Sequence, residues 1–322
     1  MKIARRMAAA FLGTLAAMLL MMASVFAAEG VTNWEEGTVT VVGNGIAPPA
    51  TVNAAQAKAL AKRAATVDAY RQLAESVKGV NVDSESTVEN MMVLSDVTKT
   101  KVNATIQGAR ILKVDYLPDG MCEVTMQVSI FGVSGSLAEA VLPPNPTPTA
   151  FPAPDPAVAP APAPATTEVN VNVSVGTTAP AAPAAPMPTV QTPTQKPVVT
   201  GTSAAPAPTG KAVGKYTGLI VDCRGLGLRP CMSPVIKNDK GNPIYGYKNL
   251  DSRKVISNGM AGYTKDMGNA PRAGENPLVV KAVAVDNHNS NPVITTADAN
   301  RVLIENGATG ILDHTNVVFV RD

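Results

Sequence analysis

The sequence predicts an α+β protein: two small helix-on-sheet domains joined by a long, disordered Pro/Ala-rich linker. Three features predict this class: an alanine-rich run with helical spacing at residues 51–77, an alternating apolar and polar run at residues 122–130, and a proline-dense tract after residue 142. A chain of 322 residues is also long enough for two domains. The predicted division is residues 1–28 as a signal peptide, 36–142 as the first α+β domain, 143–212 as the Pro/Ala/Thr linker and 213–322 as a second α+β domain of unknown type.

One helix, predicted from Thr51 to Val77, organises the first domain. Pro48 and Pro49 prevent an earlier start, and Gly79 is expected to end the helix as a left-handed cap. Because its contact face is mostly alanine, a partner can approach closely, and a sheet is the natural partner. The residues expected on that face share helical spacing: Leu60, Ala64, Val67, Ala74 and Val77.

Strands are predicted before and after this helix in the sequence. Thr38 to Val42 is a short strand, and Gly43-Asn44-Gly45 is interpreted as a tight turn, because the third glycine of a dinucleotide-binding loop is missing. Residues 122–130 alternate strictly, as a half-buried strand does. Cys122 lies on the apolar side of this strand and is expected to be a core thiol.

Residues 1–28 have the pattern of an export signal. Lys2, Arg5 and Arg6 precede a long apolar run, and Ala27 supplies the small residue of a cleavage site. The alternative is an uncleaved membrane anchor. No cysteine follows the apolar run, so lipid attachment of the bacterial lipoprotein kind is not expected. We expect an exported protein of the periplasm or outer cell envelope, with no transmembrane segment after signal cleavage.

The linker is composed of proline, alanine and threonine with almost no charge. Such a tract cannot bury enough apolar area to fold, and its prolines favour an extended polyproline conformation. Val169 to Val175 interrupts it with strict alternation. This stretch is either an unstructured segment or a strand that adds to the sheet edge of a partner.

The most unusual stretch of the second domain runs from Asp222 to Cys231. Cys223 and Cys231 either form a disulfide, as an exported protein permits, or are two small buried residues. Asp222, Arg224 and Arg229 either form a polar pocket for an anionic ligand or belong to a glycine turn with a structural ion pair.

Composition and motifs exclude or disfavour several classes of function. The 27 Lys and Arg residues nearly balance the 25 Asp and Glu residues, which argues against a nucleic-acid partner. Neither of the two histidines has metal-ligand spacing around it. Asp286 to Pro292 is rich in oxygen ligands but lacks the glycine and distal glutamate of a calcium loop, so a plain turn is expected. We therefore expect no catalytic residues, no cofactor and no metal, and the protein is not expected to be an enzyme.

Several runs of the first domain resemble a known family. The run from Ala61 to Leu73 has the pattern Ala-x-Arg-Ala-Ala-x-x-Asp-Ala-Tyr-Arg-x-Leu, and residues 42–48, 107–111 and 122–128 extend the likeness. The domain resembles the exported domain shared by the N-terminal part of flagellar assembly protein T and the twenty-kilodalton outer-membrane lipoproteins, over about residues 36–135. The resemblance implies a helix-on-sheet envelope domain, often near flagellar or surface machinery, without catalytic residues. This sequence departs from it by lacking the lipoprotein cysteine.

These observations favour a non-enzymatic exported protein that serves as a structural or assembly factor of the flagellar or outer-membrane machinery. Its expected partners are envelope or flagellar proteins, including ones associated with the outer membrane or the cell wall. The alternative is a periplasmic ligand-binding module that captures a small anionic or cell-wall ligand at the 222–231 loop. Melting temperatures measured with candidate ligands would separate the two, because a ligand that binds the folded state raises the melting temperature.

Overall fold

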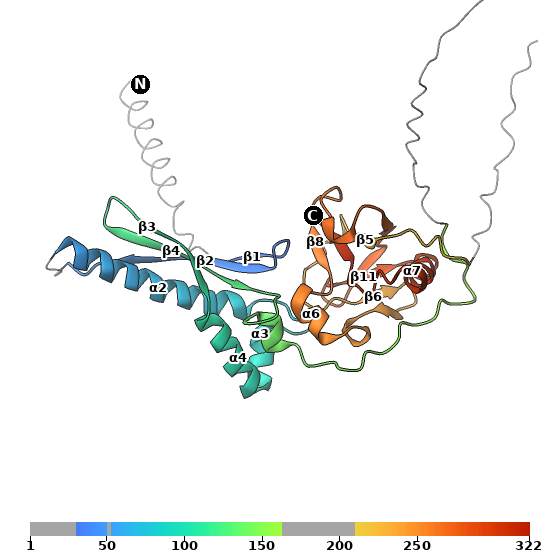
Figure 1. The fold of residues 1–322 in the computed structure, drawn as a ribbon, viewed down its shortest axis with the longest axis horizontal. Coiled ribbons are helices and arrows are strands. Elements are labelled where there is room, and N and C mark those ends of the chain that lie inside the picture. Colours follow the sequence, from blue (N-terminus) through green and yellow to red (C-terminus); the bar gives the residue numbers. More distant parts are fainter. Residues whose placement is uncertain (1–29, 50–52, 163–209) are drawn as a thin grey trace, which may run out of the picture.

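The computed structural model describes residues 30–49, 53–162 and 210–322, which form two domains that each combine helices with sheet (Figure 1). The predicted α+β class with two domains is confirmed. The predicted signal peptide and the Val169–Val175 stretch lie outside the described residues. Within the described residues, no helix has the combination of length and apolar character that crossing a membrane requires.

The first domain is a four-stranded antiparallel sheet with one long helix packed against it (Figure 1). The strands follow the order β1-β2-β4-β3. Their bounds are β1 (Val31–Asn33), β2 (Thr38–Ile46), β3 (Arg110–Tyr116) and β4 (Met121–Ser129). The helices are α2 (Ala54–Lys78), α3 (Val88–Leu94), α4 (Asp96–Gln107) and α5 (Leu137–Val141).

Strand β4 alternates as predicted. Its even-numbered residues from Cys122 to Val128 are buried, and the odd-numbered residues between them are half-buried. The Cys122 thiol is free and buried in the core, as expected.

The glycines of Gly43-Asn44-Gly45 do not form the predicted turn. Strand β2 continues through them to Ile46, paired with β4 along its whole length. A Cβ atom on Gly43 would lie 2.2 Å from the backbone nitrogen of Ala69, and one on Gly45 would lie 2.1 Å from that of Ala65. The glycines are therefore required because helix α2 packs directly on the strand backbone.

Helix α2 uses a different face from the predicted one. Val67, predicted to be buried, is 63% exposed. The buried face is instead a strict i, i+4 series that places the smallest residues opposite the glycines: Ala61, Ala65, Ala69, Leu73 and Val77. Gly79 does cap the helix, but in a right-handed conformation with φ −77°, so the predicted left-handed cap is wrong.

The second domain contains two four-stranded sheets. One is entirely parallel, in the order β8-β12-β5-β9, and the other is mixed, in the order β10-β11-β6-β7. The parallel sheet is built from β5 (Gly218–Asp222), β8 (Gly262–Thr264), β9 (Pro277–Lys281) and β12 (Val317–Val320). The mixed sheet is built from β6 (Ile236–Asn238), β7 (Pro243–Tyr245), β10 (Ala284–Asp286) and β11 (Asn291–Ile294).

Two α-helices and two 3-10 helices complete the second domain. They are η1 (Tyr247–Asn249), α6 (Ser252–Asn258), η2 (Pro271–Ala273) and α7 (Thr296–Thr309). Helix α7 is capped by Thr295 and ends at Gly310, which has a left-handed φ of 68°. The pair Asn306-Gly307 is typical of a helix end in a sequence, yet the helix continues through both residues to Thr309.

The two domains contact each other directly. Trp34, from the turn after β1, packs edge-on against Tyr263 of β8 with ring centroids 5.7 Å apart. Two backbone amides of the second domain, Met232 and Ser233, donate to carbonyl oxygens of Asn81 and Val82 at 3.1 and 2.9 Å. The apolar core is continuous across this contact.

Residues 143–162, which we call the strap, correct the prediction of an unfolded linker that begins at Pro143. The strap has no helix or strand, but it follows the surface of the second domain and bonds to it. For example, the Asn145 side chain donates to the backbone oxygens of Tyr247 and Leu250 at 3.2 and 3.0 Å. The composition is that of a linker, yet single residues such as Phe151 and Asp155 supply specific contacts.

Candidate functional site

The 222–231 loop begins where β5 ends, at the carboxyl edge of the parallel sheet. Open α/β sheets bind ligands at this edge. The Asp222 carboxylate accepts two hydrogen bonds from the guanidinium of Arg224, from Nε at 2.8 Å and Nη2 at 2.7 Å. These bonds hold the pKa of Asp222 below its ordinary value. The Arg224 guanidinium is therefore already engaged by an acidic partner.

Arg229 does not join this pair in the described part of the chain. Its backbone amide donates to the carbonyl oxygen of Asn289 at 2.7 Å, and its side chain is exposed. Gly225 and Gly227 between the two arginines have left-handed φ angles of 78° and 66°. The arrangement corresponds to the glycine turn with an ion pair rather than to a pocket of three converging charges.

No disulfide joins Cys223 and Cys231. Both thiols are free and buried, and burial raises the pKa of each to about 12. The Tyr263 hydroxyl accepts from the Cys231 amide at 3.1 Å and donates to the Cys231 carbonyl at 2.9 Å. The tyrosine that contacts Trp34 of the first domain thus also positions the second cysteine.

We expect the native thiols to resist a thiol-specific reagent at about pH 8, because the reactive thiolate is scarce when the pKa is raised. Unfolding in urea should make all three cysteines of the chain reactive. The folded state favours the protonated form of Cys223 and Cys231. The resulting contribution to the free energy of unfolding is complete below the ordinary thiol pKa of 9.0 and is lost as the pH rises toward about 12. Fast native labelling of Cys223 would contradict the expectation.

The Asp286 to Pro292 turn is contacted by a lysine of strand β6. The Lys237 ammonium lies 2.7 Å from a carboxylate oxygen of Asp286 and 3.3 Å from the amide oxygen of Asn287. Asn287, His288 and Asn289 all have positive φ angles, and the His288 Nδ1 atom lies 2.9 Å from the Ser84 oxygen of the first domain. The turn therefore contributes to the domain contact, which local spacing could not indicate.

No group of three His, Cys, Asp or Glu side chains that could hold a metal ion is found in residues 30–49, 53–162 and 210–322.

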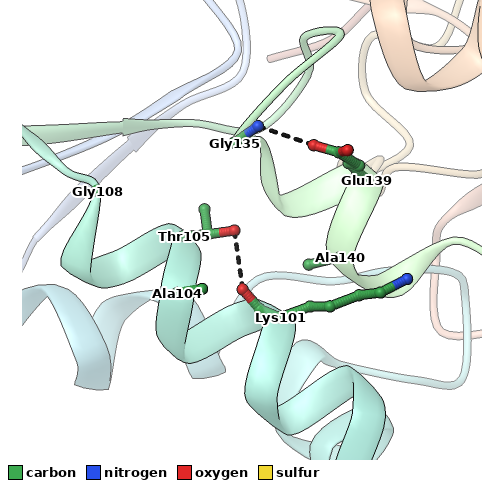
Figure 2. Close-up of a pocket in the computed structure, with 7 residues that line it drawn as sticks. All are labelled: Lys101, Ala104, Thr105, Gly108, Gly135, Glu139 and Ala140. Atoms are coloured by element: carbon green, nitrogen blue, oxygen red, sulfur yellow. Dashed lines mark hydrogen bonds between the residues drawn. The ribbon is translucent and has the colours of Figure 1, made fainter.

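A cavity of about 280 Å³ lies between α4 and α5 (Figure 2). Glu139 accepts a hydrogen bond from the Gly135 amide at 2.8 Å, and the Thr105 hydroxyl donates to the Lys101 carbonyl at 3.0 Å (Figure 2). These polar groups serve the local backbone, while Ala104 and Ala140 contribute small apolar surface.

The junction of α3 and α4 presents apolar residues to solvent. Val93, Leu94 and Val97, which we call the α3–α4 corner, are 81%, 79% and 66% exposed. The two helices extend away from the sheet in Figure 1. Contiguous exposed apolar patches mark interaction sites of proteins. Sequence reasoning missed the corner because helical periodicity cannot be recognised in a helix as short as α3, which has seven residues.

The geometry defines a two-domain protein with an exposed apolar corner on the first domain and a closed ion pair at the predicted ligand loop. Residues 43–129 match the family model of the LPP20 lipoprotein, so this part of the chain is similar to that family. Residues 218–322 match the model of the second domain of Treponema pallidum Tp0624. No curated protein matches the chain. The first match supports the lipoprotein part of the resemblance, and neither match names flagellar assembly protein T.

Proposed function

We propose that this chain is a non-enzymatic, exported protein of the cell envelope that acts as an assembly factor through protein contacts. The observation that carries the proposal is the match of residues 43–129 to the LPP20 lipoprotein family. The basic and apolar pattern of residues 1–28 supports export. The lack of a cysteine after the apolar run means that the chain would reach its place by binding a partner rather than by a lipid.

The contact would use the α3–α4 corner. Its three apolar side chains are largely exposed to water. Burial against an apolar patch of an envelope protein would remove them from water, which is favourable. The nearby cavity beside α4 offers a place for one side chain of the partner. The finer proposal, a place in the flagellar or outer-membrane machinery, rests on the sequence resemblance.

Cross-linking in the organism of origin tests this proposal. A photo-reactive residue at Leu94 is expected to give a discrete adduct in the envelope fraction, whereas the same residue at Asn103, also exposed but on another face of α4, is expected to give little. Leu94→Glu should abolish the proposed contact with an envelope protein. It should not unfold the first domain, because the Leu94 side chain is already in solvent. Full-length chain in the cytosol, or equal adducts at both positions, would argue against the proposal.

A deletion strain tests the finer proposal. Loss of motility would support a flagellar role, and intact motility with a leaky outer membrane would support the outer-membrane machinery instead. Normal motility together with an intact envelope would contradict both.

A further inference from the structure

The first part of the strap contacts two aromatic residues of the second domain, Tyr247 and Tyr245. The Tyr247 hydroxyl donates to the carbonyl oxygen of Pro143. Further along, the ring of Phe151 stacks on the buried ring of Tyr245, with centroids 6.3 Å apart and planes inclined by 2°. Aromatic side chains commonly bind extended proline-rich segments, because the extended conformation of such a segment is preformed.

Asparagine side chains of the second domain donate hydrogen bonds to the backbone of the strap. Proline has no N–H group, so a proline-rich strand offers mainly carbonyl acceptors and needs donors from its partner. The Asn249 amide of the second domain donates to the carbonyls of Thr149 and Ala150 at 3.1 and 3.2 Å. The Asn300 amide does the same at Asp155 and Val158, at 2.9 and 2.6 Å.

Charge contributes one further contact in this half of the strap. The Lys240 ammonium lies 2.7 Å from the Asp155 carboxylate. The bond lowers the pKa of Asp155. Asp155 is thus held by Asn300 through its backbone and by Lys240 through its side chain.

A buried ion pair of α7 holds the end of the strap and the start of the next described segment together. Arg301 donates through Nε to the carbonyl of Ala161 at 2.7 Å and through Nη1 to that of Lys211 at 3.1 Å. Glu305, at 0% exposure, accepts from Arg301 at 3.1 Å and from the amide of Val213 at 2.8 Å. The chain therefore leaves and re-enters the described structure at one point on the second domain.

We propose that the second domain is a recognition surface for an extended proline-rich segment, occupied here by the chain's own strap. Together with the direct domain contact, the strap would hold residues 30–162 on residues 210–322 without help from the covalent path through residues 163–209. The predicted Pro/Ala-rich linker would then not set the distance between the two domains. This inference stands independently of the proposed envelope role.

Cleavage of the full chain tests the inference. A single protease site placed at residues 184–190 would cut the chain after folding. The two fragments are expected to elute together at the volume of the uncut protein. The emission of Trp34, the one tryptophan of the chain, is expected to stay unchanged because its contact with Tyr263 persists. Separation of the fragments on the column, with a red-shifted emission, would overturn the proposal.

Variants separate the strap from the direct domain contact. Asn145→Ala removes a donor to three backbone carbonyls, so the dissociation constant of the cut halves is expected to rise about tenfold. Phe151→Ala is expected to act in the same direction by removing the ring stacked on Tyr245. Thr147→Ala, an exposed strap residue, is the matched control and should change nothing. Unchanged dissociation in both test variants would show that the strap contributes no affinity and would overturn its assigned role.

Discussion

Gly45→Val is expected to lower the free energy of unfolding of the first domain by about 3 kcal/mol or more. A Cβ atom at this position would lie 2.1 Å from the Ala65 nitrogen and 2.4 Å from the Ala61 oxygen. Both are backbone atoms of helix α2, so no side chain can rotate away and the whole helix must move from the sheet. That movement would open the core formed by the buried face of α2.

Urea denaturation followed by far-ultraviolet circular dichroism measures this effect. Gly79→Ala is the matched control in the same domain. Gly79 has an ordinary φ of −77°, and a Cβ atom added there would lie 3.6 Å from the Ser76 carbonyl oxygen, an ordinary contact distance. The control should leave the transition midpoint nearly unchanged or raise it slightly. Equal midpoints for Gly45→Val and the wild type would mean that the helix does not rest on the strand as described.

Gly45 also shows why part of the fold escaped prediction. Glycine pairs mark turns in most sequences, and nothing local distinguishes a turn from a strand on which a helix lies closely. The alanine run did predict close approach to a sheet, because small residues leave room for a partner backbone. What the sequence could not supply was the location of the approach, which depends on pairing of β2 with a strand about eighty residues away.

The strap escaped prediction for a different reason. A composition average over residues 143–212 describes proline, alanine and threonine, and such a tract lacks the apolar area for a core of its own. It can still bind to a core that another domain provides, and then a few residues decide the outcome. Asn145, Phe151 and Asp155 are invisible in the average, yet they make the contacts with the second domain.

For the 222–231 loop, the sequence identifies the charged residues but leaves open whether they form a ligand pocket or an ion pair. Asp222 and Arg224 are two residues apart, so their pairing follows from local geometry and could be anticipated as an alternative. The buried pair Arg301 and Glu305 could not be anticipated. Charged residues at i and i+4 on a helix normally lie on its solvated face. Here the strap and the segment that begins at residue 210 cover that face.

Arg301→Met is expected to reduce the free energy of unfolding by about 3–5 kcal/mol, because it leaves a buried carboxylate without its cation. The two side chains are 4% and 0% exposed, so water does not replace the lost partner. The carbonyls of Ala161 and Lys211 lose their donors as well. Glu305→Gln leaves the arginine charge uncompensated in the same way and should also be strongly destabilising.

The double variant Arg301→Met/Glu305→Gln distinguishes a broken pair from general damage to helix α7. With no charge left in the site, it should lose clearly less than the sum of the two single losses, since each single loss includes one unpaired buried charge. Arg71→Met removes an arginine from an exposed network with Asp68 and Glu75 and should produce no measurable change. Urea denaturation of the full chain measures all four variants. Strictly additive losses would mean that the two side chains act separately, and that one ion pair of α7 does not hold the strap and the segment beginning at residue 210 together.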